Sequence, residues 1–310
     1  MPVNSIFLRN QLEYVTKEVV KQDYPEMLMA SGQILDVSDE IPSGAETYSY
    51  RIFTFVGSAA ILANGADDIP LVNAYMEKRT GVVRTVVDGY AYTVEDLEAA
   101  DFAGTNLDAE LATGAREVIE RQVDLIGYEG DSNFQLYGWL NYPNIPTYTV
   151  LADGNQNGGT NSTRFQHKTA DQVYRDLTRF ASATRTQTRG AFSPQAIAMS
   201  QSEFEIINSL VYPANTNSTL LEFFLRTQRA TAAGVQSVFP VPYLEGKGAG
   251  NTGVMTSFRK RKEYVKFHIP KDFTQERPQV VNFNFKVPCR MRTGGVELRK
   301  PLSMRKADGI

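Results

Sequence analysis

The sequence has 310 residues, 42% of them hydrophobic and 22% charged, which is typical of a folded chain with room for two cores or one elongated core. A formal net charge of -3 argues against a dedicated nucleic-acid-binding protein, because such proteins concentrate Lys and Arg against phosphates. The single cysteine, Cys289, excludes a disulfide framework and a multi-thiolate metal site. No signal pattern and no apolar run of about 18 residues is present, so we expect no membrane association.

Residues 1–45 are predicted to form an N-terminal arm that lies along a surface. Its first half has apolar residues at helical spacing, namely Ile6, Leu12, Val15 and Val19. That periodicity is lost after Pro25, so we expect no independent core in this segment.

From Glu46 the pattern changes to β structure, and residues 46–92 are predicted to form an extended two-stranded β-ribbon loop. We expect its outward limb over residues 48–56 and its returning limb over residues 82–94, with large side chains on both faces of both limbs. Such a ribbon is marginal alone in water and has open edges. It therefore needs another surface to cover it.

A long helix is predicted over residues 106–127. Its apolar residues form two adjoining stripes, one of Leu111, Val118 and Leu125 and the other of Ala112, Ala115, Ile119, Val123 and Ile126. We expect Thr105 or Asn106 to cap its start, an ion pair between Glu117 and Arg121, and a stop at Gly127. Because the helix carries no catalytic group, we interpret it as a structural rod.

After an aromatic loop over residues 137–143, the polar tract 153–159 indicates a boundary. Residues 165–239 then alternate between helical and buried-strand patterns, and the pattern from Gly253 to the end is β again. The chain is therefore expected to be of the α+β class.

Two motifs imitate ligand sites. Gly248-x-Gly250-x-x-Gly253 matches a dinucleotide fingerprint, but the residues that follow predict a strand where that fingerprint needs a helix. Asp153-x-Asn155-x-Asn157-Gly158 matches half a calcium loop, but Arg164 stands where a bidentate Glu belongs, so a turn is favoured over a calcium site.

The chain has only two histidines, His167 and His268, and no nucleophile elbow accompanies them. Both are interpreted as structural, and we expect no catalytic, cofactor-binding or metal-binding residue and no enzymatic activity. The basic run from Arg259 to Lys262 is interpreted as a solvated or ion-paired patch, with phosphate contact as the alternative. The aromatic load, 17 Phe and 15 Tyr, fits either a core or burial against partner subunits.

The order of these parts resembles the tailed-phage major capsid fold, also called the Hong Kong ninety-seven fold, which encapsulin shells share. Segments similar to one branch of that group are Tyr48-Ser49-Tyr50-Arg51, Gly57 to Leu62, Ala66 to Pro70, Gly89 to Val94, Leu97 to Ala100, Gly138-Trp139-Leu140-Asn141-Tyr142-Pro143 and Gly294 to Ile310. Trp139 departs from the usual Leu of a Gly-Leu-Leu-Asn element. The likeness covers nearly the whole chain.

The resemblance implies an N-terminal arm at 1–45, an extended β-ribbon loop at 46–92, an axial domain at 165–239, and a peripheral domain. The peripheral domain would comprise 93–164 and 240–310 and contain the spine helix 106–127. The residues expected to contact neighbouring copies are Tyr48, Tyr50, Phe53, Phe55, Ile61, Tyr90, Tyr92, Trp139, Arg259 and Lys260.

The implied function is a major capsid protein that self-assembles through pentamers and hexamers into the icosahedral head of a tailed double-stranded DNA bacteriophage. The implied partners are other copies, portal and scaffolding proteins, a decoration protein and packaged DNA held by weak non-specific contact. Assembly in the host bacterial cytoplasm and a final place in the virion follow. The alternatives are an encapsulin-type protein nanocompartment shell and, from another class, a cytosolic hydrolase.

Overall fold

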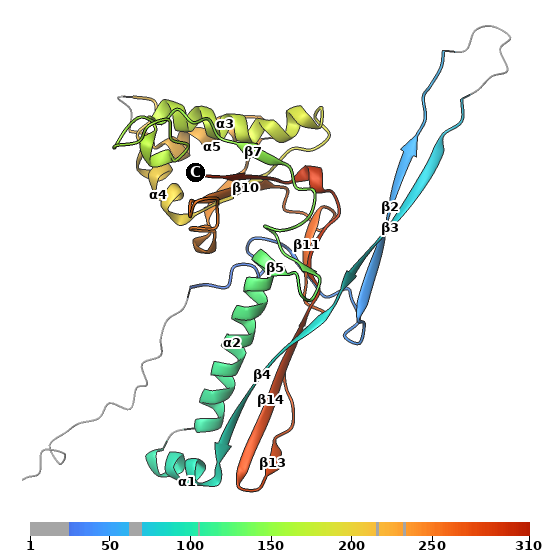
Figure 1. The fold of residues 1–310 in the computed structure, drawn as a ribbon, viewed down its shortest axis with the longest axis vertical. Helices are drawn as coiled ribbons and strands as arrows, with labels where there is room; N and C mark the ends of the chain where they lie inside the picture. The colour runs from blue at the N-terminus through green and yellow to red at the C-terminus, as the bar shows by residue number, and fades with distance from the viewer. Residues whose placement is uncertain (1–24, 62–69, 105, 215–216, 232–233) are drawn as a thin grey trace, which may run out of the picture.

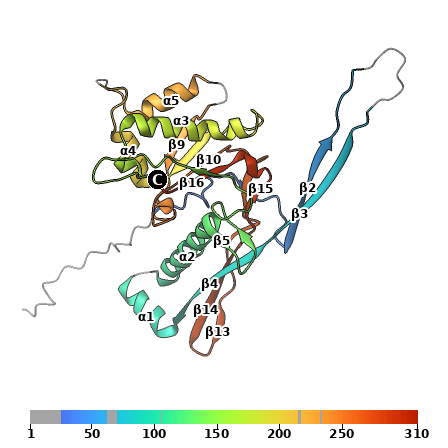
Figure 2. The same ribbon diagram turned by 45° about the horizontal axis from the view of Figure 1, so that its top comes forward.

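The computed structural model describes residues 25–61, 70–104, 106–214, 217–231 and 234–310. A long helix lies along an elongated sheet, a mixed unit of helices and strands sits at one end of it, and a two-stranded ribbon projects from the side (Figures 1 and 2). The predicted helical segment at 5–20 and residues 64–69 of the predicted ribbon tip at 64–78 lie outside the described residues.

The long helix, α2, spans Leu107–Glu129 and is the predicted rod. The side chain of Asn106 accepts from the backbone N–H of Ala109, and the Glu117–Arg121 pair forms at 3.1 Å. The expected stop at Gly127 is wrong, because the helix continues to Glu129 and Gly130, with φ of 67°, is its C-cap. Gly127 instead permits close packing, since a Cβ there would lie 2.4 Å from Cγ of Met29.

One face of α2 packs on a sheet built around β14 (Asn284–Thr293). Strand β14 pairs over its whole length with β4 (Arg84–Thr93), and on its other side with β12 (Lys271–Gln275) and β13 (Gln279–Val281). Helix α1 (Val94–Ala103) follows β4 and begins with a capping box between Thr93 and Asp96.

The ribbon consists of β2 (Thr47–Val56) and β3 (Asn73–Val82), paired antiparallel from Thr47↔Val82 to Val56↔Asn73. The expected returning limb at 82–94 is wrong, because residues 84–93 leave the ribbon as β4 and join β14. At β14 the ten-residue β4 gains both a partner strand over its whole length and the apolar face of α2, whereas the ribbon has no helix packed on it in the described residues.

The mixed unit contains a five-stranded sheet of order β7-β16-β10-β8-β9. Its strands are β7 Thr147–Thr149, β8 Ala196–Met199, β9 Ser237–Pro240, β10 Val254–Phe258 and β16 Arg305–Asp308. Its helices are α3 Ala170–Gln187, α4 Gln201–Ser209 and α5 Leu220–Arg229. A three-stranded sheet of β1 (Val37–Ser38), β11 (Val265–His268) and β15 (Gly295–Leu298) and a hairpin of β5 (Gly130–Asp131) and β6 (Leu136–Tyr137) complete the strands of the described residues.

Two hydrophobic clusters form the interior of the described residues. The first joins α2 to β11, β14 and the arm residues Met29, Ile34 and Leu35. The second lies in the mixed unit, where α3 and α5 cover the sheet through Leu177 and Phe224. The ribbon contributes no residue to either buried cluster.

Candidate assembly surfaces

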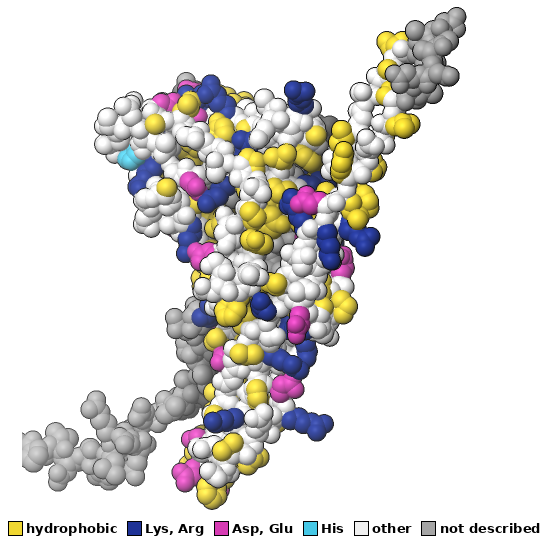
Figure 3. Space-filling view, turned by 45° about the vertical axis from the view of Figure 1, so that its right-hand side comes forward, with side chains coloured by type: hydrophobic (Ala, Val, Ile, Leu, Met, Phe, Trp, Pro, Cys, Tyr) yellow, Lys and Arg dark blue, Asp and Glu magenta, His cyan; other side chains and the backbone are white. Residues whose placement is uncertain are grey.

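The ribbon has large apolar side chains that its own subunit does not cover. Phe53, Phe55, Tyr75 and Met76 are 58%, 72%, 62% and 56% exposed. Ile61, beyond the paired strands, is fully exposed. Within the described residues, β2 and β3 pair only with each other, so both outer edges of the ribbon are open, and hydrophobic side chains are visible along its shaft (Figure 3). This surface is the one that most requires a partner.

The base of the ribbon is attached to the subunit by two tyrosines. The ring of Tyr48 lies 4.7 Å from that of His268, and its hydroxyl donates to the carbonyl of Gly294 at 3.3 Å. The hydroxyls of Tyr50 and Tyr142 are 3.2 Å apart. Burial is the main cause that raises the pKa of Tyr48 and of Tyr50 above the ordinary tyrosine value. Both residues were predicted as intersubunit contacts, and the structure also gives each an intrasubunit role.

A buried charge cluster lies directly under that base. Glu297 accepts from Nε of Arg299 at 2.5 Å, and its other oxygen lies 2.5 Å from Nε2 of His268. Lys266 donates to Glu40 at 2.5 Å. Burial alone would raise the pKa of Glu297, but the hydrogen bonds from His268 and Arg299 outweigh it and hold the pKa below its ordinary value.

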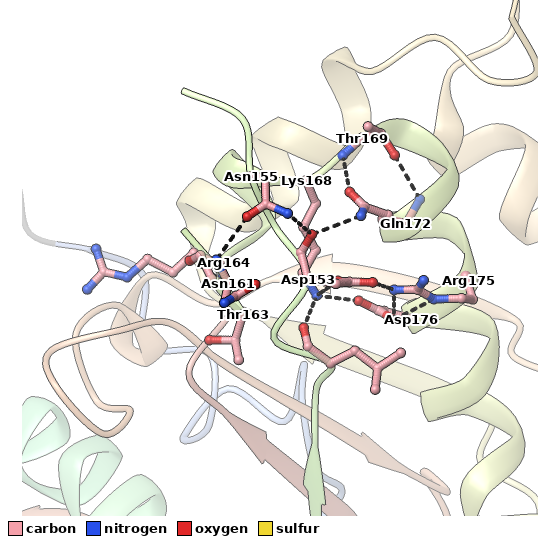
Figure 4. A network of polar contacts seen from close by, with 12 residues as sticks. Asp153, Asn155, Asn161, Thr163, Arg164, Lys168, Thr169, Gln172, Arg175 and Asp176 are labelled. Carbon is pink, nitrogen blue, oxygen red and sulfur yellow. Dashed lines mark hydrogen bonds and ion pairs between the residues drawn. The ribbon is translucent and has the colours of Figure 1, made fainter. Parts of the chain in front are cut away.

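A second polar network attaches the loop after β7 to helix α3 (Figure 4). The ammonium of Lys168, which is 2% exposed, donates to the carbonyl of Leu151 at 2.6 Å and to Asp176 at 2.5 Å. Arg175 donates to Asp153 at 2.6 Å and also to Asp176. Burial opposes ionisation of Asp153, but Arg175 and Lys168 lower its pKa overall.

The residues of the calcium-like motif stabilise this loop through hydrogen bonds and ion pairs. Asp153 faces two cations, and the side-chain oxygen of Asn155 accepts from the backbone N–H of Asn161 at 3.0 Å. Asn157 donates to the carbonyl of Gln166 at 2.8 Å. In the described ranges, no group of three or more His, Cys, Asp or Glu residues is placed to hold a metal ion. The glycine motif at 248–253 leads into strand β10, as predicted, and not into a helix.

Three other predicted contact residues lie within the subunit. Trp139 is fully buried between Tyr128 and Phe258, so its assignment as an assembly contact is wrong in this conformation. Tyr90 is 9% exposed and donates to Asp108 at 2.9 Å, and Tyr92 stacks on Phe285. Their burial follows from the departure of β4 from the ribbon.

The basic run makes local contacts as well. Arg259 donates to the hydroxyl of Tyr264 at 3.2 Å and lies over its ring. Lys260 donates to the carbonyls of Gly32 and Gln33. These two cations therefore hold the arm and a loop, while Arg261 and Lys262 are exposed.

Sequence reasoning missed two apolar pairs on the returning side of the ribbon. Leu71 and Val72 lie just before β3, and Tyr75 and Met76 lie within it. The first two are 81% and 68% exposed. Their signal was available as an apolar pair and a Tyr-Met pair, but the segment was interpreted as part of the tip.

The described part of the chain is an extended fold whose surface ribbon is not covered by the rest of the subunit. Such a fold is typical of assembly subunits, in which a neighbouring molecule covers the exposed surface. The chain belongs to the major capsid protein family, whose model matches residues 57–310. This assigns the α+β capsid fold that the sequence predicted. A comparison with curated protein sequences gives no match.

Solved structures with the same fold come from several sources. The capsid of Myoviridae phage XM1 superposes with a TM-score of 0.82 at 16% identity, covering 99% of this chain and 100% of that one. A chain of the native GTA particle capsid gives 0.65 at 10% identity, covering 97% and 96%. A virus-like particle from Pyrococcus furiosus gives 0.55 at 9% identity, covering 88% and 89%. None of the helices in the described ranges is both long and apolar enough to span a membrane.

Proposed function

We propose that copies of this chain assemble through pentamers and hexamers into the icosahedral head of a tailed double-stranded DNA bacteriophage and enclose its genome. The observation that carries the proposal is the ribbon, whose exposed apolar side chains and open edges are covered by no other segment of the described residues and would gain cover from a neighbouring copy. Membership of the major capsid protein family supports it.

The proposed division of the subunit has four parts. These are an arm at 1–45, a ribbon loop now limited to about 46–82, a peripheral domain that contains α2, and an axial domain at 165–239. The two hydrophobic clusters support two cores, but the second also contains Met255, Ala307 and Ile310, so the axial core takes in strands from outside 165–239. Loops of the axial domain would meet at the fivefold and sixfold axes of the shell.

The contacts between copies are expected to be individually modest. A contact in the millimolar to micromolar range is worth about 4 to 8 kcal/mol, and many such contacts in a closed lattice sum to one stable shell. Weak individual contacts also let a misplaced subunit leave. Portal, scaffolding and decoration proteins and packaged DNA are the further partners of this proposal, with assembly in the host cytoplasm and a final place in the virion.

Electron microscopy of the purified protein tests the proposal. Closed icosahedral particles are the expected result. In a separate hydrogen-exchange measurement on the particles, the ribbon of each subunit should be protected by its neighbour. A compact, stable monomer at high concentration with the ribbon folded on its own body would contradict it. Lumen contents separate the phage head from a nanocompartment shell, since packed duplex DNA identifies the first and a protein cargo the second.

A further inference from the structure

A group of exposed apolar side chains lies at the end of the elongated sheet that is opposite the mixed unit (Figures 1 and 2). This distal surface consists of helix α1 and the neighbouring β13–β14 hairpin, and the backbone N–H of Val94 joins them by donating to the carbonyl of Phe283 at 3.1 Å. Phe102 of α1 is 95% exposed, and Val280, Val281 and Phe283 of the hairpin are 64%, 48% and 79% exposed. Apolar side chains grouped in this way mark an interaction surface.

Helix α1 has no packed side in the part of the chain that the structure describes. None of its ten side chains is buried. Helices in proteins gain most of their stability from packing, and ten residues are too few for a stable isolated helix in water. The capping box at Thr93 and the left-handed Gly104 stabilise the two ends of α1, so the helix needs a partner along its side.

The side of α1 that carries Phe102 is also acidic. Glu95 and Glu98 precede Phe102 by seven and four residues, so the three side chains lie on one side of the helix. All three are exposed, and α1 contains no Lys or Arg. Neither carboxylate forms an ion pair among the described residues. A partner that covers Phe102 must therefore bring cations together with an apolar group.

The hairpin of the same chain has these properties. Arg277 precedes β13, and Lys286 of β14 pairs with Gln279. Both cations are exposed, and neither has an ion pair within the described ranges. Val281 lies on the same side of the hairpin as Lys286, because alternate residues and paired residues share a face, and Phe283 is in the turn. The hairpin of one copy thus complements the acidic side of α1 in another copy.

The position of the distal surface indicates where that other copy stands, and this step rests on the proposed function. In the proposed shell the axial domain lies at the axis of each pentamer or hexamer. The distal surface lies at the opposite end of α2 from that domain (Figure 1). It is therefore at the outer margin of its ring, where subunits of neighbouring rings meet.

We propose that the distal surface joins pentamers and hexamers to one another, with the acidic side of α1 in one copy packed against the basic hairpin of a copy in the adjacent ring. Glu95 and Glu98 face the two cations of that hairpin, and Phe102 packs against its exposed apolar side chains. Contacts between two helices or between two hairpins bring like charges together, so the charge pattern also sets the orientation of neighbouring rings.

Charge reversal in the purified full-length protein tests this contact. Glu95→Lys/Glu98→Lys and Arg277→Glu/Lys286→Glu should each form rings that do not close into shells, with a critical concentration for shells at least tenfold above that of the natural protein. The variant with all four changes should recover closed shells, because every contact again joins opposite charges. Sedimentation and electron microscopy distinguish free rings from shells.

The matched control is Glu95→Asp/Glu98→Asp, which keeps both charges while lowering helix propensity. It should close shells as the natural protein does. The melting temperature of the unassembled subunit should stay close to the natural value in every variant, since none of the four side chains is buried.

Several outcomes overturn the proposal. These are normal shell closure in both charge-reversed variants, a four-change variant that closes no better than they do, and a defect in the Asp control as large as in the Lys variant. A fall of more than about 5 °C in the melting temperature of a charge-reversed subunit would place the ion pairs within one subunit. Failure of the natural protein to form rings or shells would contradict the proposed function itself, and with it this contact.

Discussion

Nε2 of His268 lies 2.5 Å from Oε2 of Glu297, and the two side chains are 1% and 2% exposed. They come from adjacent antiparallel strands, β11 and β15, and the ring of Tyr48 packs on His268. The pair therefore connects the orientation of the ribbon to the centre of the subunit.

Glu297→Gln should destabilise the unassembled subunit by about 3 kcal/mol, because it removes the buried carboxylate that bonds both His268 and Arg299. The pKa of Glu297 is lowered from 4.5, so its contribution is present above that value and is lost as the pH falls through the lower folded-state pKa. Urea unfolding between pH 3 and pH 7 should show a larger acid-dependent loss in the natural protein than in the variant, which keeps only the contributions of other carboxyls with a lowered pKa, such as Asp153.

The control for that experiment is Glu40→Gln. Its carboxylate also pairs with a buried lysine, Lys266, but is itself 60% exposed, and Lys266 keeps Glu297 at 3.9 Å, so the cost should be smaller than that of Glu297→Gln. Equal costs for the two variants would show that burial of the His268–Glu297 pair is not the cause.

Gly81→Ala should disturb the base of the ribbon. A Cβ at this position would lie 2.3 Å from Cζ of Tyr48, so the ring must leave its place against His268. We expect a fall in particle yield by sedimentation. The control Gly114→Ala meets nothing within 4 Å and lies in an exposed helical position, where Ala should stabilise by up to about 1 kcal/mol. A normal yield for Gly81→Ala would count against the role of Tyr48.

Phe55→Ser and Trp139→Ala should separate assembly from folding. Phe55 is 72% exposed, so its loss should leave the melting temperature of the free subunit unchanged and raise the critical concentration for assembly about tenfold or more. Trp139 is fully buried, and its loss should destabilise the subunit by about 3 to 5 kcal/mol. A melting temperature lowered by Phe55→Ser would mean that the ribbon is covered within its own subunit.

Lys168→Met should destabilise the free subunit by about 3 kcal/mol, since Asp176 keeps a buried charge and loses the fully buried one of its two cationic partners, with only Arg175 remaining. Asp176→Leu added to Lys168→Met should recover much of that loss, because a buried apolar pair needs no compensation. Chemical unfolding of both single variants and the double variant measures the coupling. Additive losses would show that the two groups do not act as a pair.

The sequence predicted the elements whose signals are local. The rod was recognisable from apolar spacing, its Asn cap and the Glu117–Arg121 pair, and all three occur in the structure. The strand after Gly253 was recognisable from its apolar run and excluded the dinucleotide site.

The errors arose where the choice of partner strand decides the structure. Nothing local in residues 84–93 distinguishes pairing with the ribbon from pairing with β14, which is about 200 residues later in the chain. Trp139 was assigned to a surface because its loop is rich in aromatics, yet Phe258 and Tyr128 enclose it from distant segments. The His268–Glu297 pair was also missed, because its two residues are brought together only by the pairing of β11 with β15, which no local sequence pattern indicates.

The five-stranded sheet has a consequence for biosynthesis. Its strand β16, at residues 305–308, lies between β7 and β10, so the ribosome must make almost the entire chain before that sheet can close. The ribbon, at residues 47–82, emerges much earlier, and the strand beneath its base, β15, is among the last to follow. Each nascent chain thus exposes an apolar, aggregation-prone hairpin during most of its translation. A chaperone that binds the hairpin in this period would protect the chain from aggregation.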